Sequence, residues 1–119
     1  MGLNQVSYQK IKDSIIITPK ESMHDSYVQQ FIENTLNILV RENPKIMIID
    51  LSHIETVDSF MGRTINELVK SAKLVGVKTS AIGIRPEVAI TLVELGFNLL
   101  NVKMYRTLEQ ALYNQNEVD

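Results

Sequence analysis

Residues 46–62 read Ile-Met-Ile-Ile-Asp-Leu-Ser-His-Ile-Glu-Thr-Val-Asp-Ser-Phe-Met-Gly. The apolar run over residues 46–51, interrupted only by Asp50, is typical of a central strand that is buried on both faces. The polar turn behind it ends at Asp58, which fits the N-cap of a helix and places Ser59 in the first turn of that helix. This stretch therefore predicts a strand, a turn and a helix that begins at an exposed hydroxyl.

The alternation of strands and helices continues on both sides of this stretch. The expected strands are residues 6–11, 14–18, 46–51, 78–84 and a short segment within 98–105; the expected helices are residues 26–42, 59–75, 86–95 and a last one opened by Thr107 and Gln110. Strands that alternate with helices pair in parallel through right-handed crossovers. The order β-β-α-β-α-β-α-β-α thus predicts an α/β fold, with a mainly parallel sheet of four to five strands, an antiparallel N-terminal edge strand and about four flanking helices.

Length and composition indicate a single domain. A chain of 119 residues with 45% hydrophobic residues is long enough to bury a core without disulfides, and it contains no cysteine. We expect one domain over residues 1–119, with its core at about 6–113 and a frayed polar tail at 114–119.

Charge and residue usage argue against several classes of partner. Lys plus Arg is 12 and Asp plus Glu is 14, a net charge of −2, whereas a nucleic-acid binder normally has a basic excess. His24 and His53 stand alone, outside any metal-ligand spacing, and no glycine-rich phosphate loop occurs. No apolar run approaches the roughly 18 residues of a membrane span, and the N-terminus lacks a secretion signal. We expect no cofactor, no metal, no nucleic acid, no membrane partner and a cytoplasmic location.

Asp58 and Ser59 have two interpretations. In the first, Asp58 is a helix cap and Ser59 is only a small polar residue in the first turn. In the second, Ser59 is a phosphorylation site, because a phosphate there would lie in the positive end of the helix field. The phosphate would add about −1.5 to −2 charges beside Asp58 and so change the surface potential with little damage to the fold.

A hydrolase is a further interpretation, with Ser59, His53 and Asp50 as a nucleophilic triad. The serine lacks the Gly-x-Ser-x-Gly elbow that exposes such a nucleophile, so we expect no enzymatic activity.

Gly62 costs the helix about 1 kcal/mol relative to alanine. It indicates that another group approaches the helix closely, either from a partner or from within the chain. Arg85 is expected to be either a solvated charge or a partner contact.

Three segments carry a family resemblance: residues 48–60, residues 71–78 and residues 83–96. The combination of Asp58-Ser-Phe60 with Gly83-Ile-Arg-Pro-Glu87 resembles the STAS domain (sulfate transporter and anti-sigma-factor antagonist). Within that family it resembles the small stressosome antagonists of the RsbS type, and the resemblance spans about residues 14–112.

The resemblance implies a non-enzymatic scaffold with the strand and helix order given above. Such proteins co-assemble with larger, sensor-bearing STAS paralogues into a large particle, although a homodimer is also possible. They sequester a switch serine/threonine kinase and release it when the serine that matches Ser59 is phosphorylated. In the larger paralogues a second phosphorylated threonine matches Thr91, which makes Thr91 a candidate second site. The surface expected to bind partners comprises Asp58, Phe60, Met61, Gly62 and Arg63.

An alternative within the same family is a stand-alone anti-sigma-factor antagonist that binds an anti-sigma kinase directly. The simpler sporulation antagonists carry Asp-Ser-Ser-Gly at the corresponding place, whereas this chain has Asp58-Ser-Phe-Met61. This difference favours the stressosome type.

Overall fold

A five-stranded sheet forms the centre of the computed structural model, which describes residues 7–20, 25–97 and 102–114. The strands follow each other across the sheet in sequence order: β1 (Tyr8–Ile11), β2 (Ser14–Ile17), β3 (Ile46–Asp50), β4 (Lys78–Ile82) and β5 (Lys103–Tyr105). β1 pairs with β2 in antiparallel fashion, and the other pairs are parallel. The N-terminal hairpin therefore supplies the antiparallel edge that the sequence predicts.

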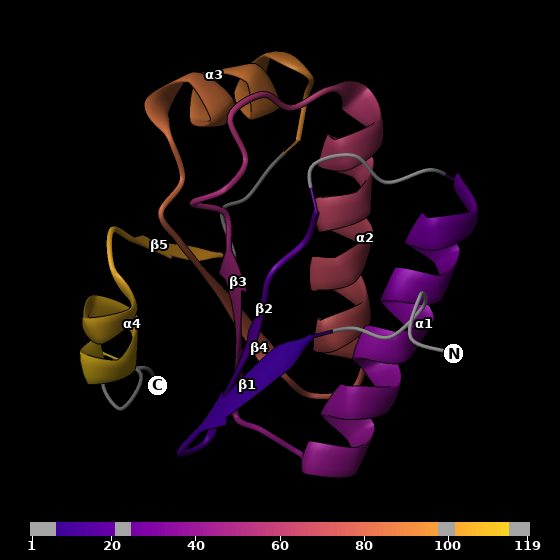
Figure 1. Cartoon of the computed structure of the whole chain (residues 1–119), viewed down its shortest axis with the longest axis vertical. Helices are drawn as coiled ribbons and strands as arrows, with labels where there is room; N and C mark the ends of the chain where they lie inside the picture. The colour runs from indigo at the N-terminus through magenta and orange to yellow at the C-terminus, as the bar shows by residue number, and fades with distance from the viewer. Residues whose placement is uncertain (1–6, 21–24, 98–101, 115–119) are drawn as a thin grey trace.

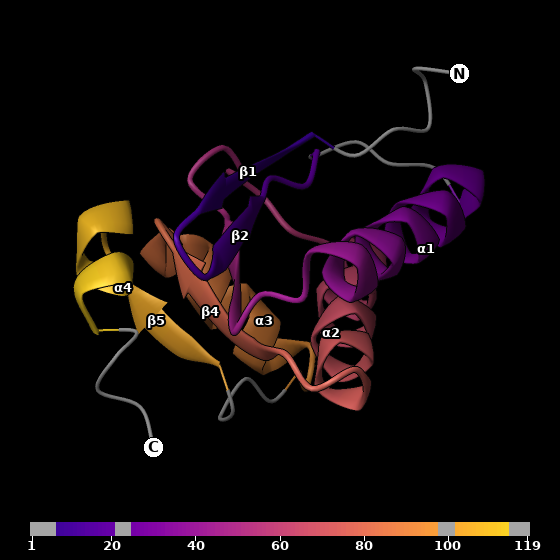
Figure 2. The same ribbon diagram turned by 90° about the horizontal axis from the view of Figure 1, so that it is seen from below.

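Four helices surround this sheet: α1 (Asp25–Glu42), α2 (Ser59–Leu74), α3 (Pro86–Glu94) and α4 (Leu108–Asn114). α1 and α2 lie side by side on one face, and α4 lies against the other face near β5 (Figures 1 and 2). α3 lies at the end of the sheet where β3 leads into the loop before α2 (Figure 1). The start of α2 and the whole of α3 therefore meet at the carboxyl ends of the parallel strands.

The predicted fold class and order of elements are confirmed over the described residues. The strand expected at 78–84 ends at Ile82, because Gly83 adopts a left-handed φ of 70° and leaves the extended conformation. α2 ends at Leu74, and Gly76, with a φ of 82°, occupies the left-handed position after its end. Of the expected tail, residues 115–119 lie outside the described residues.

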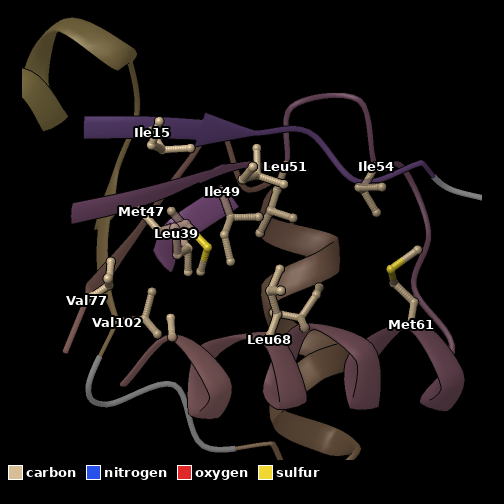
Figure 3. Packing of buried hydrophobic residues seen from close by; sticks show 14 of the residues in the cluster. Ile15, Leu39, Met47, Ile49, Leu51, Ile54, Met61, Leu68, Val77 and Val102 are labelled. Atoms are coloured by element: carbon tan, nitrogen blue, oxygen red, sulfur yellow. The ribbon is translucent and has the colours of Figure 1, made fainter. Parts of the chain in front are cut away.

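The two faces of the sheet bury different members of the same strands. Ile15 and Ile17 of β2, with Met47 and Ile49 of β3, pack in one cluster with Leu39 of α1 and Leu68 of α2 (Figure 3). Alternate residues of β2 and β3, with Ile82 of β4, form a second cluster that includes Ala111 of α4: Ile16, Ile46, Ile48 and Ile82. Because each large apolar side chain contributes about 1.5–3 kcal/mol when buried, this two-sided burial explains why β2 and β3 read as continuous apolar runs.

A polar cluster joins the edge strand β1 to the end of α1. The Tyr8 hydroxyl donates to Glu42 Oε2 over 3.1 Å, and the Lys10 ammonium donates to Glu42 Oε1 over 3.2 Å. Arg41 in turn donates to the Tyr8 hydroxyl over 3.1 Å. The hydrogen bond from Lys10, followed by that from Tyr8, lowers the pKa of Glu42 below its ordinary value of 4.5.

We expect Glu42→Gln to lower the free energy of unfolding at neutral pH but not in acid. Because the pKa of folded Glu42 lies below its ordinary value, folding favours the ionised carboxylate. Its contribution is complete above pH ~4.5 and is lost as the pH falls through the lowered pKa. Urea unfolding of wild type and variant at several pH values should show a difference that closes on acidification. Glu67→Gln is the control, and a Glu42→Gln difference that is independent of pH would contradict the prediction.

Candidate functional site

The loop between β3 and α2 is held in place at the end of the sheet. Asp50 Oδ1 accepts hydrogen bonds from the Ser52 backbone N–H over 3.0 Å and from the Ser52 hydroxyl over 2.7 Å. The Leu51 N–H donates to the carbonyl of Ile82 on β4 over 2.9 Å. Leu51 and Ile54 are 1% and 0% exposed. The loop is therefore anchored at two apolar points, which limits how far the segment leading to α2 can move.

Asp58 and Ser59 form the start of α2 as the sequence predicts. Asp58 is the N-cap, and its Oδ1 accepts a hydrogen bond from the Met61 N–H over 2.8 Å. The Asp58 carbonyl accepts the first backbone bond of the helix, from the Gly62 N–H over 2.9 Å. Ser59 is the first residue of α2 and is exposed. Its hydroxyl is thus presented on a helix start that has its own cap and does not depend on the serine.

The five residues expected to bind partners do not all lie at the surface. Asp58 and Arg63 are exposed, and Phe60 is half-buried. Met61 is only 4% exposed and belongs to the core cluster, and Gly62 is buried. The structure therefore places Met61 in the core (Figure 3) and Gly62 beneath the surface, and contact of these two residues with a partner stays a prediction.

Gly62 is explained by a contact within the chain. A Cβ built on Gly62 would lie 2.5 Å from Cε2 of Phe97, so the aromatic ring occupies the space that a side chain would need. Phe97 follows α3, and its N–H donates to the Leu92 carbonyl over 3.0 Å. The segment after α3 thus packs directly on the first turn of α2. The glycine within the helix indicated a close approach, but nothing in the sequence pointed to Phe97 as its cause.

A second contact connects the start of α3 to the same loop. A Cβ on Gly83 would lie 2.7 Å from Cβ of Ser52, so the turn after β4 rests against the turn after β3. Arg85 donates to the Ser52 carbonyl over 3.4 Å and lies 4.0 Å from the carboxylate of Glu55. Arg85 therefore has partners within the chain. The residue before α3 contacts the loop after β3, and the segment after α3 packs on the first turn of α2.

The remaining candidates are Thr91 and the residues considered for a catalytic triad or a metal site, and none of those that the structure describes forms a hydrogen bond with Ser59. The Thr91 hydroxyl donates to the Glu87 carbonyl on α3 over 2.9 Å. His53 is exposed, and Asp50, its proposed triad partner, accepts the two bonds from Ser52 described above. His24 lies outside the described residues. Within the described ranges, no group of three or more His, Asp or Glu side chains is placed to hold a metal ion.

The fold and this site define a class of protein: an α/β domain that presents a serine from the start of a helix at the carboxyl edge of its sheet. The pattern of the STAS domain matches residues 5–111. The chain therefore belongs to the STAS domain family, as its sequence resemblance predicts.

Curated relatives come from Bacillus subtilis (strain 168). The RsbT co-antagonist protein RsbRB is 38% identical over 85 residues, which cover 71% of this chain and 31% of the relative. The RsbT co-antagonist protein RsbRD is 33% identical over 106 residues, which cover 88% of this chain and 38% of the relative. The chain spans about a third of the length of these relatives.

Solved structures support the same relationship. A serine-to-glutamate variant of RsbS from Moorella thermoacetica is 33% identical with a TM-score of 0.85, over 92% of this chain and 96% of that one. A chain in a structure of the stressosome, described as a signal integration and transduction hub, has the same identity and TM-score over 93% and 96%. The unphosphorylated anti-sigma factor antagonist SpoIIAA, at 10% identity and a TM-score of 0.66, shares the fold. The predicted likeness to the RsbS type is confirmed.

Among the described residues, no helix is both long and apolar enough to cross a membrane.

Proposed function

We propose that this chain is a non-enzymatic scaffold of a stressosome and that it holds a switch serine/threonine kinase until Ser59 is phosphorylated. The observation that carries the proposal is the exposed Ser59 at the capped start of α2, in a STAS domain similar to RsbS. The proposed partners are the kinase and a larger, sensor-bearing STAS paralogue, and the proposed location is the cytoplasm. The relatives named as RsbT co-antagonists are consistent with a shared partner of this kind.

The proposed contact region, called the Ser59 surface below, consists of Asp58, Ser59, Arg63 and the half-buried Phe60. Before modification this surface carries one negative and one positive side chain, and it can fit closely against a partner. A phosphate brings about −1.5 to −2 charges into that contact, and a charge that is desolvated without a partner is costly. Because about 1.4 kcal/mol corresponds to a tenfold change in affinity, a few kcal/mol of repulsion and desolvation is enough to release the kinase.

Ser59 suits such a switch because its modification leaves the fold intact. The helix start is capped by Asp58, so the Ser59 hydroxyl is not needed to satisfy the Met61 N–H.

Thr91 is a second proposed phosphorylation site. Its hydroxyl bonds to the Glu87 carbonyl within α3, and a phosphate there would have to replace that bond.

Kinase retention by Ser59 variants tests the proposal. We expect immobilised Ser59→Ala to retain the kinase as wild type does and Ser59→Asp to retain it at least about tenfold less, because only the latter adds charge to the contact. Thr107→Asp is the matched control, since it adds the same charge at the exposed start of α4. Incubation with kinase and ATP should modify Ser59, as read by mass spectrometry of the peptide. Equal retention by Ser59→Ala and Ser59→Asp would refute the switch.

Assembly with a sensor-bearing paralogue tests the other half of the proposal. Size-exclusion chromatography of the mixture should yield a particle far larger than a dimer. A small complex of this chain with the kinase alone would instead support the stand-alone anti-sigma-factor antagonist.

A further inference from the structure

Arg63 lies one helical turn beyond Ser59 on α2. Residues i and i+4 of a helix are surface neighbours, with Cβ atoms about 5–6 Å apart. Both residues are exposed, so a long side chain at position 63 can reach a group attached to position 59 without any backbone movement.

The guanidinium of Arg63 is also available. Within the described residues it has no hydrogen bond and no ion pair, and the carboxylate of Glu67, one turn further on, does not pair with it. Two other charged side chains at this end of the sheet, Asp58 and Arg85, have partners within the described residues. Asp58 caps the Met61 N–H, and Arg85 lies against Glu55 and the Ser52 carbonyl.

We propose that the Arg63 guanidinium binds the phosphate of phosphorylated Ser59 within the same chain by donating hydrogen bonds to its oxygens, an inference that rests on the phosphorylation of Ser59 proposed above. Guanidinium groups bind phosphate oxygens through two parallel hydrogen bonds, which a planar fork on a neighbouring turn can supply. In the unmodified protein the Arg63 side chain is exposed, and no group among the described residues pairs with it, so it can bind an acidic group of a partner.

This pairing gives one modification two effects on the Ser59 surface. The phosphate adds negative charge, and its pairing with Arg63 also withdraws the cation from the partner. The charges of Asp58 and Arg63 sum to zero before modification, whereas the same group of residues carries about −1.5 to −2 afterwards. A partner that recognises the unmodified surface through Arg63 therefore loses its contact and meets repulsion in the same step.

The second pKa of the phosphoserine tests the inference. Phosphoserine is introduced at position 59 during translation, so the sample does not depend on any kinase. Phosphorus NMR titrations then compare the second phosphate pKa in three proteins that all carry phosphoserine 59: the parent sequence, Arg63→Gln and Lys70→Gln. A neighbouring cation stabilises the dianion, so Arg63→Gln should raise the phosphate pKa by about half a unit or more. Lys70→Gln should leave it unchanged, because this exposed cation of α2 lies about 16 Å along the helix from position 59.

Salt provides a second readout. The difference in phosphate pKa between the parent and Arg63→Gln should shrink in 1 M NaCl, because salt screens exposed ion pairs. Equal phosphate pKa values in the parent and Arg63→Gln, or a difference that salt does not change, would overturn the inference. Either result would leave the proposed switch untouched, whereas failure of the kinase to modify Ser59 would refute the switch without touching the pairing.

Discussion

Gly83→Ala is expected to lower the free energy of unfolding by about 2–4 kcal/mol, through two separate effects. Gly83 has a φ of 70°, a left-handed conformation that costs a residue with a Cβ about 1–2 kcal/mol. The new methyl group would also lie 2.7 Å from Cβ of Ser52, closer than two carbon atoms can pack. The turn that follows β4 and the turn that follows β3 would have to separate. Urea or thermal unfolding measures the loss.

Gly76→Ala is the matched control for this substitution. Gly76 has a similar φ of 82°, but nothing lies within 4 Å of the position a Cβ would take. It should show the backbone cost alone, about 1–2 kcal/mol. The difference between the two variants then reports the contact with Ser52, and equal losses would show that this contact carries no energy.

The Gly83 variant also bears on function, because Ser52 lies in the loop that leads from β3 to Ser59. If separating the two turns displaces that loop, folded Gly83→Ala should bind the kinase more weakly than folded Gly76→Ala. Binding measured at a temperature where both variants are fully folded makes this comparison.

Leu68→Ala should be the other strongly destabilising substitution, with a loss of about 2–5 kcal/mol. Leu68 is 1% exposed and points from the middle of α2 toward Ile49 and Leu51 (Figure 3). Truncation removes buried apolar area and leaves a cavity, which the sheet and helix around it can fill only in part.

Leu74→Ala is the control on the same helix. Leu74 is the last residue of α2 and is 86% exposed, so its truncation should change stability by no more than about 0.5 kcal/mol. Denaturant unfolding of both variants separates the effect of burial from that of the substitution itself. A Leu68→Ala loss below about 1 kcal/mol would contradict the packing of α2 on the sheet.

The sequence predicted the elements of this fold well because their signals are local. The apolar run of β3, the cap at Asp58 and the proline at the first position of α3 each act within a few residues. Element ends were less well predicted. The strand β4 was expected to reach residue 84, but it ends at Ile82 because the backbone turns at Gly83.

The site was predicted in part. Ser59 and Asp58 were placed correctly at the start of α2, because a helix cap is a local pattern. Met61 was expected to be part of the partner-binding surface, whereas the structure buries it in the core. Met61 is buried and Arg63 is exposed, although both lie within residues 59–63. Which of these side chains is buried depends on how α2 packs, and that packing is not a local property of the sequence.

The sequence by itself determined the order of strands and helices, the family and the serine that begins α2, since hydrophobic periodicity, caps and motifs are read along the chain. Only the tertiary structure decided that Phe97 fills the space beside Gly62, that Ser52 touches the Gly83 turn and that Arg85, unlike Arg63, has polar partners among the described residues. The physical reason is distance along the chain. These contacts join residues thirty or more positions apart, and they form only when the parallel strands bring their carboxyl ends to one edge of the sheet.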